Sequence, residues 1–108
     1  MTQPEKRLQS TLERDLPKLG LVVAHVNYTT LSPQGGHTTL GFPDLVIIGR
    51  DVVDLWELKS PTGRLNEHQR DFHSICERSG YTIPVIRSID GALSRLGERF
   101  PLRLQGLR

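Results

Sequence analysis

The stretch GFPDLVIIGRDVVDLWELK, residues 41–59, decides the fold of this chain. It contains the continuous apolar run Leu45-Val46-Ile47-Ile48, which is typical of a central strand buried on both faces. The segment Gly49-Arg50-Asp51 indicates a hairpin turn. Residues 52–59 follow as a second strand, in which side chains alternate between the two faces. The stretch therefore predicts an antiparallel pair of strands at the centre of a sheet.

The segments on either side of this hairpin extend it into a mixed α/β fold. The expected elements are a helix over residues 4–19, strands over 21–26, 45–48 and 52–59, a helix between Asn66 and Gly80, a strand over 81–86 and a helix from 89 to about 97. Leucines at helical spacing indicate the first helix, and Pro17 is expected to disturb its last turn. Asn66 and Gln69 form a capping-box pattern for the second helix.

The order of these elements, α-β-β-β-α-β-α, predicts an α/β fold with a mixed central sheet flanked by helices. The first three strands can form a meander, and the helix before the last strand allows a parallel crossover. At 108 residues the chain is one domain, residues 1–108.

Composition narrows the class of protein. No stretch approaches the roughly 20 apolar residues that span a bilayer, and the N-terminus lacks the apolar core of a secretory signal. The single cysteine, Cys76, excludes an internal disulfide and a cysteine-rich zinc site. We therefore expect a cytoplasmic protein without membrane contact. The net charge is only +2, but 11 of the 14 basic residues are arginine, which suits phosphate binding and also follows from GC-rich coding.

The stretch 41–59 contains a candidate site of three residues. Alternation places Glu57 and Lys59 on one face of their strand. A carboxylate binds a hard cation such as Mg²⁺, and a lysine can orient water or stabilise charge on a phosphate. An isolated Glu-x-Lys pattern is more often a solvated salt bridge. However, the hairpin should place Asp44 beside this pair, because a tight turn brings the outer ends of both strands together.

Three motifs resemble the VRR-NUC domain of the PD-(D/E)xK nuclease superfamily. They are Gly41-Phe42-Pro43-Asp44, Glu57-Leu58-Lys59 and the segment GRLNEHQ at 63–69. The resemblance extends from residue 5 to about residue 90. It implies a restriction-endonuclease-like core and a metal-dependent DNA endonuclease.

The resemblance also implies roles for individual residues. Asp44, Glu57 and the Leu58 backbone carbonyl would ligate one or two Mg²⁺ or Mn²⁺ ions. Lys59 would position the attacking water. Gln69 would help to orient Lys59 or the substrate phosphate.

The family also uses a glutamate of its first helix, for which Glu5 and Glu13 are the candidates. At about 100° per residue, Glu5 falls on the stripe formed by the leucines of this helix, whereas Glu13 lies on its flank. A carboxylate on an inward stripe needs a partner, and a metal would supply one. Glu5 is therefore favoured, with an exposed N-terminal charge as its ordinary alternative.

Other polar residues carry weaker expectations. The histidines lack paired-ligand spacing, so His25, His68 and His73 are expected at the surface or the core edge, and His37 is a candidate DNA contact. The candidate phosphate contacts are Arg7, Arg64 and Arg70, for each of which a solvated arginine is an equal alternative. The long loop before Asp44, residues 27–41, is expected to border the DNA.

These expectations combine into one function and two rivals. The expected protein is an endonuclease that cuts branched DNA, such as four-way junctions or flaps. It would act as a homodimer, because stand-alone members of the family resemble junction-cleaving enzymes, including phage members of this size. One alternative is a DNA-binding module without cleavage, and the other is a nuclease acting on plain duplex DNA.

Overall fold

The computed structural model describes residues 1–26 and 40–101 of the chain. Its elements are α1 (Gln3–Asp15), the 3₁₀ helix η1 (Leu16–Leu19), β1 (Val22–His25), β2 (Leu45–Gly49), β3 (Val52–Leu58), α2 (Glu67–Arg78), β4 (Val85–Ile86) and α3 (Ile89–Arg99). The order agrees with the order expected from the sequence. His37 and most of the loop 27–41 lie outside the described residues.

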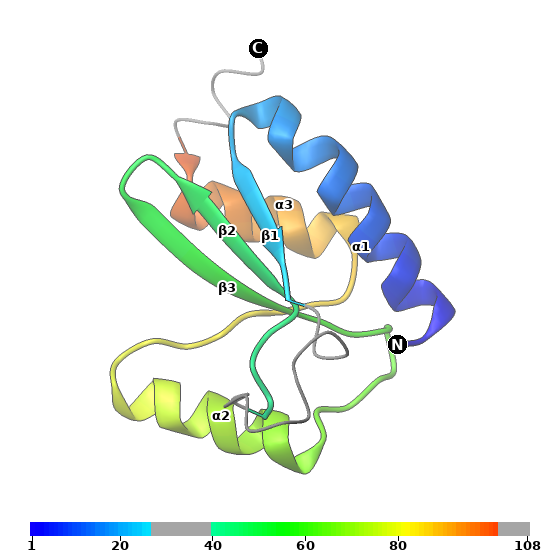
Figure 1. Cartoon of the computed structure of the whole chain (residues 1–108), viewed down its shortest axis with the longest axis vertical. Coiled ribbons are helices and arrows are strands. Elements are labelled where there is room, and N and C mark those ends of the chain that lie inside the picture. The colour runs from blue at the N-terminus through cyan, green and yellow to red at the C-terminus, as the bar shows by residue number, and fades with distance from the viewer. Residues whose placement is uncertain (27–39, 102–108) are drawn as a thin grey trace, which may run out of the picture.

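The four strands form one mixed sheet in the order β1-β2-β3-β4. β1 with β2 and β2 with β3 are antiparallel pairs, and β3 with β4 is a parallel pair. The β2–β3 register pairs Leu45 with Trp56. α2 makes the connection between β3 and β4, so the expected crossover and meander are both confirmed (Figure 1).

α1 and α3 cover one face of the sheet and bury the core against it (Figure 1). Trp56 and Leu58 of β3 and the β2 side chains Leu45 and Ile47 point into this core and are almost fully buried. Burial of one such side chain contributes roughly 1.5–3 kcal/mol relative to exposure. Because side chains alternate along a strand, Trp56 packs in the core on the opposite face of β3 from Glu57.

α2 lies beyond the ends of the strands and not over a face of the sheet (Figure 1). The face opposite the core therefore keeps exposed apolar side chains on the upper halves of its strands. Val22 is 57% exposed and Val53 is 52% exposed. Only the lower end of this face, where Glu57 lies, is closed by α2.

Local sequence signals explain where the helices begin and end. Thr2 and Glu5 form a capping box at the start of α1, and Asn66 and Gln69 form one at the start of α2. Proline cannot donate the bond that an α-helix needs. As Pro17 predicted, the last turn of the first helical segment is a separate 3₁₀ helix.

Two details of the expected elements are wrong. The fourth strand is only Val85–Ile86 and not 81–86, because Tyr81 approaches β3 through its hydroxyl, which binds the Leu55 backbone. α3 continues to Arg99, past the expected end near residue 97. The apolar sides of α2 and α3 are only partly covered, since Ile75 is 51% exposed and Leu93 is 47% exposed.

Candidate functional site

Asp44 and Glu57 lie opposite each other at the outer ends of β2 and β3. The pairing of Leu45 with Trp56 makes them cross-strand neighbours on the same face of the sheet. Asp44 Oδ2 accepts a hydrogen bond from the Leu58 backbone N–H at 2.8 Å. Since the N–H and C=O of one strand residue point to the same edge, the Leu58 carbonyl also faces Asp44. The hairpin thus brings the first two expected site residues together.

Glu57 is a buried carboxyl group, with 0% of its surface exposed. Burial raises its pKa well above the ordinary value of a glutamate, and the hydrogen bond and negative charge of Asp44 raise it further. The nearby Lys59 opposes these effects only in part. Two carboxyl groups that share a site cannot both ionise easily without a cation.

Two side chains of α2 hold the oxygens of Glu57. Gln69 Nε2 donates to Oε2 at 3.2 Å, and His73 Nε2 lies 3.1 Å from Oε1. Gln69 Oε1 also accepts from the Asn66 backbone N–H, so the capping box fixes this amide. Burial lowers the pKa of His73, which favours a hydrogen bond between a neutral imidazole and Glu57 over an ion pair. In the described contacts Gln69 thus binds Glu57 and not Lys59.

Glu5 approaches the same end of β3 from α1. It is buried, and its Oε1 accepts a hydrogen bond from the Ser60 backbone N–H at 3.2 Å. Its charge contributes to the raised pKa of Glu57. Glu13, by contrast, accepts from Gln9 on the half-exposed flank of α1. Of the two glutamates, only Glu5 lies at the candidate site.

A pocket of about 390 Å³ opens beside this site. Its lining is formed by Leu40, Gly41, Phe42, Asp44, Asn66, His68 and Gln69. Gly41 has a φ of +84°, and a Cβ there would lie 2.1 Å from the His68 carbonyl oxygen. Only glycine therefore permits this close approach of the segment before β2 to the first turn of α2. The pocket gives a ligand access to Asp44 and Gln69.

The chemistry of the paired carboxyls suits a divalent cation. Within residues 1–26 and 40–101, no group of three or more His, Cys, Asp or Glu side chains is arranged to hold a metal ion. Mg²⁺, however, is often bound by one or two carboxylates, with waters and substrate phosphate completing its shell. Asp44 and Glu57, with the raised pKa of Glu57, fit that mode of binding.

The arginines expected to contact phosphate have different surroundings. Arg70 donates to the Leu65 carbonyl at 2.7 Å, and Arg64 is exposed. Arg7 lines a shallow surface hollow with Lys6 on the outer side of α1. Arg87, which sequence reasoning missed, donates to the Ser60 and Gly63 carbonyls and thereby holds the loop that follows Lys59.

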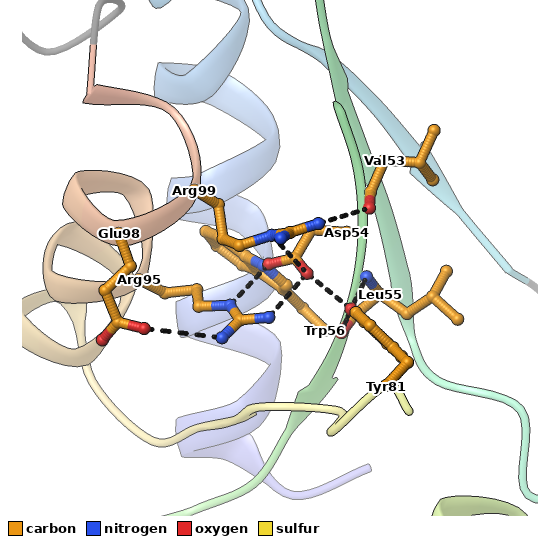
Figure 2. Close-up of polar contacts among 8 residues, drawn as sticks. All are labelled: Val53, Asp54, Leu55, Trp56, Tyr81, Arg95, Glu98 and Arg99. Carbon is orange, nitrogen blue, oxygen red and sulfur yellow. Dashed lines mark hydrogen bonds and ion pairs between the residues drawn. The ribbon is translucent and has the colours of Figure 1, made fainter. Parts of the chain in front are cut away.

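A second buried carboxylate, Asp54, lies on the core face of β3 (Figure 2). Arg95 of α3 donates one hydrogen bond to each of its two oxygens, at 2.7 and 2.8 Å. Trp56 Nε1 and the Tyr81 hydroxyl also donate to it, and Arg99 lies 3.5 Å away. Burial opposes ionisation of Asp54, but these donors outweigh burial and lower its pKa. Asp54 is therefore a structural anion that joins α3 to the sheet.

Sequence reasoning missed two buried polar residues, Asp54 and His73. One signal was available for each. Asp54 interrupts the apolar positions of β3 on the same face as Trp56, and a carboxylate there requires a partner. His73 follows Gln69 by four residues, so both lie on one helix face. The expectation that His73 lies at the surface or core edge is wrong, because its side chain is 10% exposed and contacts Glu57.

The chain resembles a solved structure described as a VRR_NUC domain. The match has a TM-score of 0.66 and 24% sequence identity, and it covers 92% of this chain and 99% of that chain. This likeness establishes the fold, an α/β arrangement consistent with a restriction-endonuclease-like core. No protein-family model matches the chain, and no curated protein matches it. In residues 1–26 and 40–101, no helix is long and apolar enough to cross a membrane.

Proposed function

We propose that this chain is a metal-dependent DNA endonuclease of the VRR-NUC family. The observation that carries the proposal is the meeting of Asp44 and Glu57 at the paired strand ends, with the pKa of Glu57 strongly raised. Perturbed carboxyl pairs of this kind are concentrated at catalytic sites. The solved VRR_NUC domain, which shares the fold, supports this proposal.

Each residue of the site has a role in this proposal. A divalent cation, Mg²⁺ or Mn²⁺, would be held by Asp44, Glu57 and the Leu58 carbonyl and would stabilise charge that develops on the phosphate. Lys59 orients the attacking water and takes part in its activation. Gln69 fixes the orientation of Glu57 through its bond to Oε2. Glu5 binds the Ser60 backbone and fastens α1 to the site, and it is a candidate for a further ligand of the cation.

The pocket beside Asp44 supports a nucleic-acid substrate. At about 390 Å³ it has room for one nucleotide, and Phe42 and His68 contribute aromatic surface to it. Stacking of bases on aromatic side chains contributes roughly 1–3 kcal/mol per base. Unpaired bases stack in this way more readily than paired ones, which favours a flap with a single-stranded arm over continuous duplex.

We further propose that the protein acts as a homodimer, since two sites related by a twofold axis match a four-way junction. Light scattering of the protein with a junction DNA tests this point. A mass of one protein chain per junction at saturation would contradict it.

A DNA-binding module without cleavage is the main rival. It would need neither the pairing of Asp44 with Glu57 nor a lysine beside them, and both features oppose it. A nuclease acting on plain duplex DNA is the second rival, and comparing the cutting of branched and linear substrates distinguishes it from the proposal.

Cleavage of four-way junctions, flaps and linear duplex with Mg²⁺, Mn²⁺ or EDTA tests the proposal. We expect metal-dependent cutting of the branched substrates. Lys59→Ala should reduce the cutting rate by on the order of a thousandfold, the upper end of the loss seen when one donor that acts in the transition state is removed. DNA binding should persist in this variant. Full activity of Lys59→Ala or Asp44→Ala would overturn the mechanism, and Glu5→Ala decides whether Glu5 is a ligand.

A further inference from the structure

His73 and Gln69 reach Glu57 from the same face of α2. They lie one helical turn apart, and each contacts a different oxygen of the Glu57 carboxyl group. We propose that His73 is a positioning residue for Glu57, which with Gln69 fixes the plane of this carboxylate for a divalent cation shared with Asp44. This inference rests on the proposed function, because it assumes that Glu57 is a metal ligand.

The geometry of this contact supports a positioning role. The His73 Nε2 to Glu57 Oε1 distance is 3.1 Å, and the exposed fractions of the two side chains are 10% and 0%. An ionised carboxylate can only accept, so the imidazole must present its Nε2 hydrogen to it. With one donor on each oxygen, the carboxylate cannot rotate about its last bond without breaking a buried hydrogen bond.

Such a contact has a measurable consequence for metal binding. Hydrogen bonds from neighbouring side chains orient metal ligands, and their loss typically weakens metal binding 10- to 100-fold. Asp44 is oriented separately, by the Leu58 backbone N–H, so a change at His73 leaves that half of the site intact. The expected effect is therefore weaker metal binding with the fold preserved.

The test measures Mn²⁺ affinity of the full chain without DNA, by electron paramagnetic resonance or calorimetry. His73→Leu removes the donor at similar volume and should weaken Mn²⁺ binding about 10- to 100-fold. His73→Gln can place an amide N–H near the position of Nε2 and should restore most of the affinity. His25→Leu removes a half-exposed histidine of β1 that lies beside Glu13, and it should leave the affinity unchanged.

Each outcome decides between positioning and packing. His73→Leu with a lower melting temperature but wild-type Mn²⁺ affinity would show that His73 only packs, and the proposal would fail. If His73→Leu does not fold, His73→Gln is compared with His73→Asn, whose amide is too short to reach Glu57. Tighter Mn²⁺ binding by the Gln variant supports the proposal, and equal affinities overturn it.

Asp44→Ala separates this inference from the proposed function. If Asp44→Ala abolishes Mn²⁺ binding and His73→Leu does not weaken it, only the role of His73 is refuted. If the wild type binds no Mn²⁺, or binds it equally well after Asp44→Ala, the proposed metal site fails and the role of His73 fails with it.

Discussion

Strand β3 carries two buried carboxyl groups three residues apart, Asp54 and Glu57, and their surroundings are opposite. Both side chains are 0% exposed. Asp54 points to the core face, where Arg95 binds both of its oxygens. Glu57 points to the other face, where another carboxyl group, Asp44, is its neighbour. The pKa of Asp54 is lowered and that of Glu57 is raised.

The difference teaches how a structural carboxylate can be distinguished from a candidate catalytic one. Asp54 receives its counter-charge from α3 of the same chain, so the folded protein is complete without a ligand. Glu57 has only uncharged groups, the amide of Gln69 and the imidazole of His73, on its oxygens, and Lys59 compensates its charge only in part. Its charge becomes favourable when a cation arrives from solution, which is the property that a metal site requires.

Asp54→Asn is the change that should destabilise the fold most. It keeps the size of the side chain but removes the buried partner of Arg95, which then keeps only the more distant, exposed Glu98 at 3.6 Å. Loss of one member of a buried ion pair costs roughly 3–5 kcal/mol, and the free energy of unfolding should fall by about 3 kcal/mol in urea denaturation. Asp51→Asn, on the exposed turn after β2, is the matched control. A loss below about 1 kcal/mol, the size expected of an exposed ion pair, would contradict the comparison. It would mean that the pair of Asp54 with Arg95 contributes little to the stability of the fold.

Gly41→Ala should have the next largest effect and should act on the Glu57 side alone. The new Cβ would meet the His68 carbonyl, so the first turn of α2, which carries Gln69, must move. Gly80→Ala is the matched control, since Gly80 has a similar φ of +90° but nothing within 4 Å. The left-handed conformation costs an alanine roughly 1–2 kcal/mol at either position.

The two glycine variants should therefore differ in function more than in stability. In Gly41→Ala the clash should lower the free energy of unfolding by about a further 1 kcal/mol. This variant should also bind Mn²⁺ more weakly, whereas Gly80→Ala should bind Mn²⁺ as the wild type does. Equal Mn²⁺ affinities in the two variants would show that Glu57 does not depend on the position of α2.

The sequence was sufficient to predict the topology and the meeting of Asp44 with Glu57. The apolar run at 45–48 and the turn at 49–51 determine an antiparallel pair, and the geometry of that pair places the strand ends together. The inward position of Glu5 followed from helical periodicity in the same way, and its burial agrees. These features depend on local patterns, which a single sequence displays directly.

The contacts made across elements distant in the sequence could not be predicted in this way. Arg95 lies 41 residues from Asp54 in the sequence, and the hydrogen bonds between them depend on how α3 packs on the sheet. The fourth strand begins only at Val85, because Tyr81, its expected first residue, instead contacts the Leu55 backbone through its hydroxyl. The contact of His73 with Glu57 depends on the position of α2 beyond the strand ends, which no local periodicity specifies.

Glu57→Gln has the smallest expected effect and the opposite sign from Asp54→Asn. A carboxyl group whose folded pKa is raised holds its proton more tightly in the folded state than in the unfolded state. Its contribution to stability is present below the unfolded pKa of about 4.5 and is lost as the pH rises toward the folded pKa. Glutamine cannot ionise, so metal-free Glu57→Gln should become more stable than the wild type above pH 5.

Urea denaturation in EDTA at pH 5 and pH 8 measures this gap. The difference in the free energy of unfolding between the variant and the wild type should grow from pH 5 to pH 8 by at least about 1 kcal/mol. This is slightly less than the free energy of one pKa unit. Mn²⁺ should then stabilise the wild type at pH 8 more than the variant, because a neutral amide oxygen is a weaker ligand than an ionised Glu57. A gap that stays constant with pH would mean that Glu57 is already ionised and compensated within the protein, as Asp54 is. The two carboxylates of β3 would then be alike, and the argument for a cation at Glu57 would lose its electrostatic basis.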